Sequence, residues 1–310
     1  MKISRYIIIL IVSIIVVDNV FSMLFSRIYS DTFSGQSGGK INYFISQKNH
    51  VSLLALGDSR CAHHVIPKRL SENGYNLSHN GLSLIFHAGL ADFIINNSSV
   101  QIDTLLIHIG KEEPFNSSNN LDDIRFLKQY YGANEWITHT TDSLFTFDKM
   151  KHFFASYKWN GIVLSTVKNW IQSDLPPKNG YKPIPPSQRD SINVYWSIQN
   201  ATDRQDSMQE FDESFIKLID HLKRLCNEKE IVLVCFSSPS YPVLLDDPSN
   251  DLLKIFFSKL DIFYVDFEKG NLDEIGLVWL WKDMHHLNSL GAEVYSKKLH
   301  ESLMDLGSLN

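Results

Sequence analysis

The sequence lacks several features that would assign it to a particular class of protein. Only three of its 310 residues are cysteines (Cys61, Cys226 and Cys235), too few for a disulfide framework, and the odd number leaves at least one free thiol in the monomer. Basic residues form no run and are outnumbered by acidic ones, 29 against 35, so the net charge of -6 argues against nucleic acid as the main partner. No internal repeat or low-complexity tract is visible. The remaining composition, 44% hydrophobic and 21% charged, is typical of a globular protein with a sizeable core.

A long apolar stretch lies at the N-terminus. After a short basic lead, residues 6–17 carry no charge and residues 20–25 are mostly apolar. A helix over residues 6–25 would span about 30 Å, the thickness of a bilayer core. The alternative is a cleaved signal peptide, but no Ala-x-Ala site follows, so an uncleaved membrane anchor over residues 1–29 fits better. In both cases we expect the bulk of the chain outside the cytoplasm, on the periplasmic or cell-surface side.

Asp18 is an awkward residue in such an anchor. A charge in lipid costs several kcal/mol unless it is paired or lies near the interface. Two explanations remain open, a partner membrane helix and a position close to the outer headgroups. Residues 30–40 are small, polar and rich in glycine, which predicts a linker. We expect the globular domain to cover residues 41–310.

The pattern of apolar residues in this domain predicts an α/β fold. Four short apolar runs are typical of strands buried on both faces, and they are residues 51–56, 104–109, 231–236 and 262–267. Residues 211–228 and 290–306 have apolar positions at helical spacing. Alternating strands and helices favour a mostly parallel sheet with helices on both faces, in which ligands lie at the carboxyl ends of the strands.

The stretch from about 115 to 205 differs from the rest of the domain. It is rich in aromatic residues, lacks clear strands, and contains a proline-rich segment over residues 174–186 that can be neither a continuous helix nor a central strand. We interpret it as a helical insertion with a proline-rich loop. Whether it covers the edge of an active site or only packs the core stays open at this point.

Two short motifs about 225 residues apart carry the chemistry. Gly57-Asp58-Ser59 follows the first predicted strand, and Asp283-x-x-His286 lies close to the C-terminus. A serine at the end of a strand together with a histidine and a carboxylate can supply a nucleophile, a base and an orienting group. The pair of motifs therefore indicates serine-dependent acyl chemistry.

These motifs, together with Gly81 in the segment from Asn76 to Gly81, resemble the SGNH (GDSL-type) hydrolase superfamily. The resemblance covers about residues 50–110 and 230–305, and it implies a three-layer αβα, flavodoxin-like fold. The N-terminal segment, Ser59-Arg60, and the run from His286 to Ala292 are most similar to membrane-anchored members. Those members act on cell-surface polymers, and some relatives are O-acetyltransferases for exopolysaccharide or peptidoglycan.

The resemblance also implies roles for individual residues. Ser59 would be the nucleophile, His286 the general base and acid, and Asp283 the group that orients His286. The backbone N–H groups of Ser59 and Gly81 would donate hydrogen bonds to the oxyanion. In the third block of the superfamily an asparagine side chain is a further donor, but this sequence has Glu112 there, which cannot donate when ionised.

Simpler interpretations stand beside these roles. The turn at Ser59 could be an ordinary helix cap, His286 could be structural, and His285 or Cys61 could compete as base or nucleophile. His63-His64 could suggest a metal site, but no His-x-x-x-His spacing supports one, so we expect neither metal nor cofactor. Arg60 either binds an anionic substrate group or pairs with Asp58, and Glu112 is a second candidate substrate-binding residue.

The sequence thus predicts a membrane-anchored, extracytoplasmic esterase or O-acyltransferase. It would act through an acyl-enzyme on Ser59, on acyl groups, in the first place acetyl, of a cell-envelope glycan or other acylated carbohydrate. A membrane-bound partner could supply the acyl group. The alternative is a catalytically inactive binding or assembly subunit of a surface-polysaccharide system, which Glu112 and Asp18 favour mildly.

Overall fold

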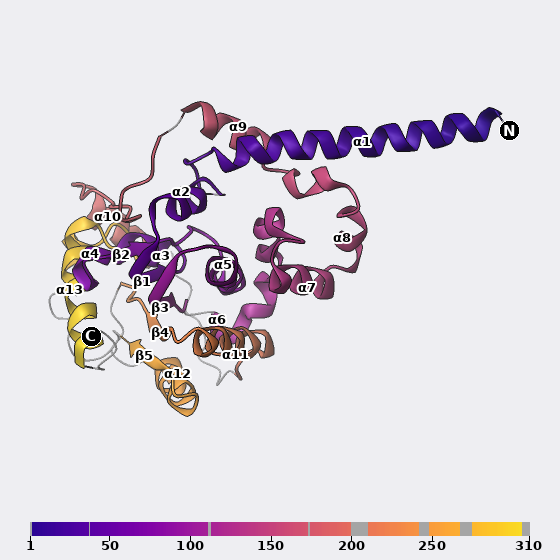
Figure 1. Ribbon diagram of the computed structural model, residues 1–310. Helices are drawn as coiled ribbons and strands as arrows, with labels where there is room; N and C mark the ends of the chain where they lie inside the picture. The colour runs from indigo at the N-terminus through magenta and orange to yellow at the C-terminus, as the bar shows by residue number, and fades with distance from the viewer. Residues whose placement is uncertain are drawn as a thin grey trace.

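The centre of the protein is a five-stranded parallel sheet with helices on both faces (Figure 1). The computed structural model describes residues 2–36, 38–110, 113–172, 174–199, 210–241, 248–266 and 275–305. The strands, in the order β2-β1-β3-β4-β5 across the sheet, are β1 (His50–Leu56), β2 (Gly74–Asn76), β3 (Gln101–His108), β4 (Val232–Ser237) and β5 (Phe263–Asp266). This is the strand order of a flavodoxin-like doubly wound sheet.

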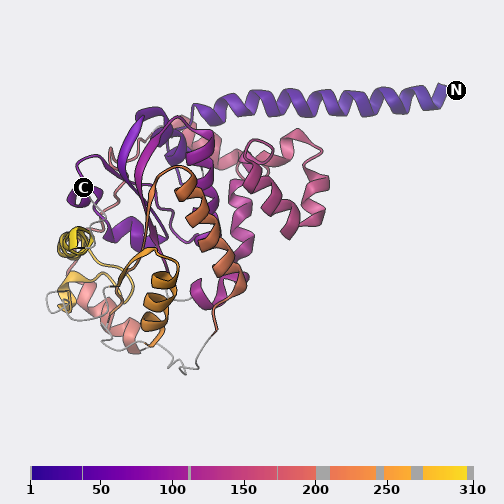
Figure 2. The same ribbon diagram turned by 60° about the horizontal axis from the view of Figure 1, so that its bottom comes forward.

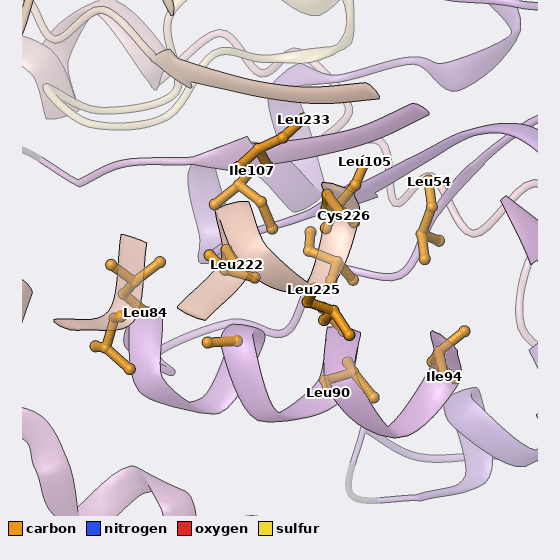
Figure 3. Packing of buried hydrophobic residues seen from close by; sticks show 14 of the residues in the cluster. Leu54, Leu84, Leu90, Ile94, Leu105, Ile107, Leu222, Leu225, Cys226 and Leu233 are labelled. Atoms are coloured by element: carbon orange, nitrogen blue, oxygen red, sulfur yellow. The ribbon is translucent and has the colours of Figure 1, made fainter. Parts of the chain in front are cut away.

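The two faces of the sheet bury separate apolar clusters. On one face, Leu105 and Ile107 of β3 pack with Leu90 of α5 (Leu84–Asn97) and Leu222 of α11 (Glu213–Glu228), as Figure 3 shows. On the opposite face, neighbouring strand residues pack against α13 (Ser289–Asp305), and this cluster includes Leu106 and Tyr295. Burying one such side chain contributes roughly 1.5–3 kcal/mol, so the central strands are stabilised from both sides.

The four strands predicted from apolar runs are confirmed as β1, β3, β4 and β5. Over the described residues, their observed ends differ from the predicted ends by at most three residues. The two predicted helices are confirmed as well, and they correspond to α11 and α13. Two elements were not predicted from the sequence: β2, a short edge strand, and α5. Helix α5 has no single apolar stripe because ten of its fourteen residues are buried. It lies between the sheet and η1 (Ser117–Tyr130), so it is covered on two sides.

The described part of the stretch from 115 to 205 is built of short helices. After η1 come α7 (Glu135–Leu144), α8 (Thr146–Lys151), η2 (Ala155–Trp159), α9 (Val163–Gln172) and α10 (Asp190–Gln199). Helix α6 (Glu113–Asn116) precedes η1, and the proline-rich residues run between α9 and α10. The smaller helices elsewhere are α2 (Gly39–Gln47), α3 (Ser59–His64), α4 (Pro67–Leu70), α12 (Pro248–Lys259) and η3 (Val278–Leu280).

Helix α1 (Lys2–Ser30) projects from the body of the molecule, as both ribbon views show (Figures 1 and 2). Among the described residues it is the one helix long and apolar enough to cross a membrane. Its C-terminal part is fixed to the domain. The carboxylate of Asp18 accepts hydrogen bonds from the backbone N–H groups of Ala155, at 2.6 Å, and Ser156, at 3.1 Å. Asp18 therefore finds its partners within this chain.

The segment expected as a linker forms a packed turn between α1 and α2 in its described residues. The side-chain amide of Asn42 donates to the carbonyl oxygens of Tyr29 and Thr32, and the hydroxyl of Ser34 donates to the carbonyl of Asn169. These bonds connect α1, α2 and α9. The direction of α1 is therefore set by the domain.

Buried histidines should make the stability of this fold depend on pH. Burial lowers the pKa of His87 to about 3, and burial also lowers the pKa of His79 well below its usual value. Below about pH 6.5 the unfolded chain then binds protons that the folded chain does not, so stability falls as the pH falls. Each such group contributes up to about 1.4 kcal/mol per pH unit.

We therefore expect the denaturant midpoint of the full chain in detergent to drop between pH 7 and pH 5. His87→Gln should reduce this drop, whereas His139→Gln, at an exposed position, should leave it unchanged. A midpoint that stays constant over this range, or an equal drop in the His87 variant, would contradict the expectation.

Candidate active site

A tight turn brings Ser59 to the carboxyl edge of the sheet. Strand β1 ends at Leu56, and Ser59 is the first residue of α3. Between them, Asp58 caps the helix by accepting a hydrogen bond from the backbone N–H of Arg60 at 2.9 Å. A Cβ atom at Gly57 would lie 2.4 Å from that of His108, so only glycine fits here. The local sequence thus fixes where the serine hydroxyl lies.

Ser59, His286 and Asp283 form one hydrogen-bonded chain. The hydroxyl of Ser59 lies 2.8 Å from Nε2 of His286, and Nδ1 of His286 lies 3.0 and 3.1 Å from the two carboxylate oxygens of Asp283. The side chains of His286 and Asp283 are 26% and 35% exposed, so a substrate can reach them. With Nδ1–H donating to Asp283, Nε2 is free to accept the serine proton.

The loop around Asp283 orients both members of this pair. One carboxylate oxygen also accepts the backbone N–H groups of His285, at 2.8 Å, and His286, at 2.9 Å. Partial burial opposes ionisation, but these hydrogen bonds and the bond from the imidazole outweigh it and lower the pKa of Asp283. Asp283 is therefore a carboxylate at neutral pH.

His64 links this loop to the rest of the site. Its Nε2 accepts the backbone N–H of Leu287 at 2.9 Å, so the proton is on Nδ1, which donates to the hydroxyl of Ser238 at 2.5 Å. Burial lowers the pKa of His64 well below its usual value, which keeps the ring neutral. One buried side chain of α3 thus connects the residue after His286 with the end of β4.

Asp58, in the turn before Ser59, pairs with a buried histidine. The carboxylate of Asp58 is 3.1 Å from Nδ1 of His108, a side chain that is 1% exposed. Burial would raise the pKa of Asp58, but His108 and the charge of Arg60 outweigh it and bring the pKa well below its usual range.

The side chain of Arg60 was expected either to bind an anionic substrate group or to pair with Asp58. The contacts do not show direct pairing with Asp58. Nη2 of Arg60 lies 3.3 Å from Nδ1 of His285 at the edge of the site.

The two backbone N–H groups expected to bind an oxyanion are those of Ser59 and Gly81. The N–H of Ser59 has no acceptor within its helix because it is in the first turn. Gly81 is exposed, has a φ of +72°, and has open space where a side chain would be. The turn at Gly81 lies beside the site, because the amide nitrogen of Asn80 is 3.2 Å from Nε2 of His63, whose ring centroid is 5.8 Å from that of His286.

A cavity of about 250 Å³ adjoins this turn. Gly81 and Asn80 form part of its wall, and Ile41, Phe86 and Phe126 provide apolar surface. A larger cavity of about 360 Å³ lies near Tyr264, and no member of the hydrogen-bonded chain lines it. The hydrogen-bonded chain does not line the cavity at Gly81 either, but this cavity shares Asn80 with the turn that contacts His63.

Three further candidate residues are Glu112, Cys61 and His285. Glu112 lies outside the described residues. Its neighbour Glu113 accepts the backbone N–H of Leu84 at 3.0 Å, at the start of α5. Burial raises the pKa of the Cys61 thiol to about 12, which makes Cys61 a poor nucleophile, and His286 rather than His285 contacts Ser59.

The proline-rich loop borders the site. Nδ1 of His63 donates to the carbonyl of Lys182 at 2.7 Å, and the carbonyl of Ile184 accepts the N–H of Ser289 at 2.7 Å. The loop therefore runs past α3 and the start of α13. The helices from η1 to α9 lie elsewhere, against α5 and α1. The loop of the insertion thus lies beside the site, whereas its helices pack in separate places and α10 lies near η3.

Sequence reasoning missed the structural roles of His64 and His108. His63-His64 was considered only as a possible metal site, and the structure uses the ring nitrogens of both residues in hydrogen bonds to protein groups. No local pattern could have revealed these bonds, because their partners come from distant segments. The one signal in the sequence was the position of His108 near the end of a predicted buried strand.

Replacing His64 should destabilise the loop that carries His286. His64→Ala leaves the buried N–H of Leu287 and the hydroxyl of Ser238 without their partner and opens a cavity, at a cost of about 2–4 kcal/mol. His285→Ala, at the exposed position before His286, should lower the free energy of unfolding by less than about 0.5 kcal/mol. Denaturant unfolding of both variants measures the difference, and equal free energies of unfolding would contradict this role.

Comparison with known proteins adds no assignment. No protein-family model matches this sequence, and no curated protein matches it either.

Proposed function

We propose that this protein is a membrane-anchored, serine-dependent esterase or O-acyltransferase of the SGNH type. The observation that carries the proposal is the chain from the Ser59 hydroxyl through His286 to Asp283, with distances of 2.8 and 3.0 Å. The strand order of the sheet and the position of Ser59 at its carboxyl edge support the proposal.

The contacts suggest a sequence of steps. The oxygen of Ser59 attacks the carbonyl carbon of an acyl ester while Nε2 of His286 takes the serine proton. The oxyanion that forms accepts hydrogen bonds from the N–H groups of Ser59 and Gly81. His286 then gives its proton to the departing alcohol oxygen as the ester bond breaks. The product is an acyl group on Ser59 and a free alcohol.

The second half of the reaction decides between hydrolysis and transfer. His286 removes a proton from water or from an acceptor hydroxyl, and the resulting oxygen attacks the acyl carbonyl and releases Ser59. The loop through Lys182 and Ile184 lies against α3 and the start of α13, and exclusion of water by this loop would favour transfer. The cavity beside Gly81 has room for a small acyl group or part of a sugar.

The substrate class follows from the expected location. If α1 is a membrane anchor, the charge bias at its N-terminus favours an extracytoplasmic domain. The substrate there would be an O-acylated, in the first place O-acetylated, glycan of the cell envelope. A membrane-bound partner would donate the acyl group if the enzyme is a transferase.

Replacing the nucleophile tests the proposal. The full chain in detergent should hydrolyse an activated acetyl ester such as p-nitrophenyl acetate, and a fluorophosphonate probe should label it at Ser59. Both signals should fall at least about 1000-fold in Ser59→Ala, since the acyl-enzyme cannot form.

Ser165→Ala, which removes an exposed hydroxyl on α9, is the matched control and should retain both signals. If the unsubstituted protein shows neither signal but binds an acetylated glycan, the chain is the inactive binding subunit instead. Labelling that persists in Ser59→Ala would place the nucleophile elsewhere.

A further inference from the structure

The helices of the insertion leave an unusually apolar surface exposed. Seven large apolar side chains of α8, α9 and the segment after α8 are between 45% and 86% exposed. We call them the insertion patch, and they are Phe147, Met150, Phe153, Phe154, Leu164, Trp170 and Ile171. Phe147 and Met150 lie one turn apart on the same side of α8. Exposed apolar groups of this kind mark a contact with a partner or a membrane.

The insertion patch is fixed beside α1. Asp18 accepts the N–H groups of Ala155 and Ser156, which directly follow Phe153 and Phe154. One turn further along α1, the hydroxyl of Ser22 donates to the carbonyl of Ala155 and accepts the indole N–H of Trp159, both at 3.0 Å. Both ribbon views show these helices of the insertion alongside α1 (Figures 1 and 2). Phe153 and Phe154 therefore have a set height along the axis of α1.

The opposite side of α1 at this height is also apolar and exposed. Its side chains are 43–66% exposed, and they are Val20, Phe21, Met23 and Leu24. The uncharged residues 6–17 cover only about 18 Å of a bilayer core of roughly 30 Å. The lipid-facing part of the helix must therefore continue past Asp18.

Two depths are possible for Asp18, and they lead to the same conclusion. If Asp18 lies within the hydrocarbon, the N–H groups of the insertion that satisfy it lie there too. If Asp18 lies at the headgroups, the residues next to Ala155 are at the headgroups as well. In both cases Phe153 and Phe154 meet lipid.

The charges of the same segment fit an anionic lipid surface. Residues 146–172 contain four lysines, Lys149, Lys151, Lys158 and Lys168, and a single acidic residue, in a chain with a net charge of -6. That acidic residue, Asp148, is buried and pairs with Arg125 and Lys151. Aromatic side chains together with lysines are typical of segments that lie in the membrane interface.

We propose that the insertion patch is embedded in the outer interface of the membrane that α1 crosses, with anionic phospholipid as the preferred surface. This inference rests on the proposed anchor role of α1. The two contacts together would prevent the domain from pivoting about α1. The site at Ser59 would then keep one orientation toward the membrane, which suits a substrate or an acyl donor that is attached to lipid.

Depth-dependent fluorescence quenching tests the insertion patch in the full chain. Phe153→Cys carries a bimane label, and the protein is placed in nanodiscs of phosphatidylcholine and phosphatidylglycerol with and without a shallow spin-labelled lipid. The native cysteines are buried, and the unsubstituted protein measures their background labelling. We expect the spin-labelled lipid to reduce the emission of the label at 153 roughly twofold or more. Phe147→Cys should behave in the same way.

Two further positions separate the possible outcomes. The emission of a bimane label at Val12→Cys on α1 should be quenched by lipids with deep spin labels. The emission of a label at Lys217→Cys, on the exposed side of α11, should be quenched by neither kind of lipid. If position 12 is quenched and positions 147 and 153 are not, α1 is an anchor and the insertion patch meets something other than lipid. If position 12 is also unquenched, the anchor itself is wrong. Fluorophosphonate labelling of Ser59 in the same sample reports on the catalytic proposal independently.

Discussion

The whole site depends on the hydrogen bonds of one buried, neutral imidazole. His64 connects α3, which begins with Ser59, to the N–H of Leu287 and to the hydroxyl of Ser238 at the end of β4. His64 is more than 170 residues away in the chain from both Ser238 and Leu287. The entropy cost of bringing these segments together is offset by the buried sheet between them. A protonated His64 could not accept from Leu287, so its low pKa is part of the arrangement. The 2.8 Å contact between Ser59 and His286 is set by this framework.

The sequence predicted the parts that follow from local pattern. Strands buried on both faces read as continuous apolar runs, and the motifs at Ser59 and His286 lie where strand ends meet. Helix α5 was not predicted because it is buried around most of its circumference. Strand β2 was not predicted because its three residues are too few to show an alternation of apolar and polar side chains. The bonds of His64, the Asp58–His108 pair and the partners of Asp18 depend on tertiary contacts, for which the sequence holds no local signal.

The insertion contacts both the candidate site and α1. Its proline-rich loop contributes the carbonyl of Lys182 beside His63, while η2 satisfies Asp18 and presents aromatic residues next to α1. A carboxylate that is awkward in an isolated apolar helix thus becomes a means of orienting the domain. In the proposed function this would give an acyl-transferring serine a constant position relative to the membrane surface.

The most direct measurement of the central claim is to trap the acyl-enzyme. The full chain is mixed with an activated acetyl ester, quenched in acid within the first turnovers, digested and examined by mass spectrometry. We expect one acetyl group on the peptide that contains Ser59, with its amount saturating at one per chain. An acetyl group absent from that peptide under conditions of turnover, or attached to another residue, would contradict this claim.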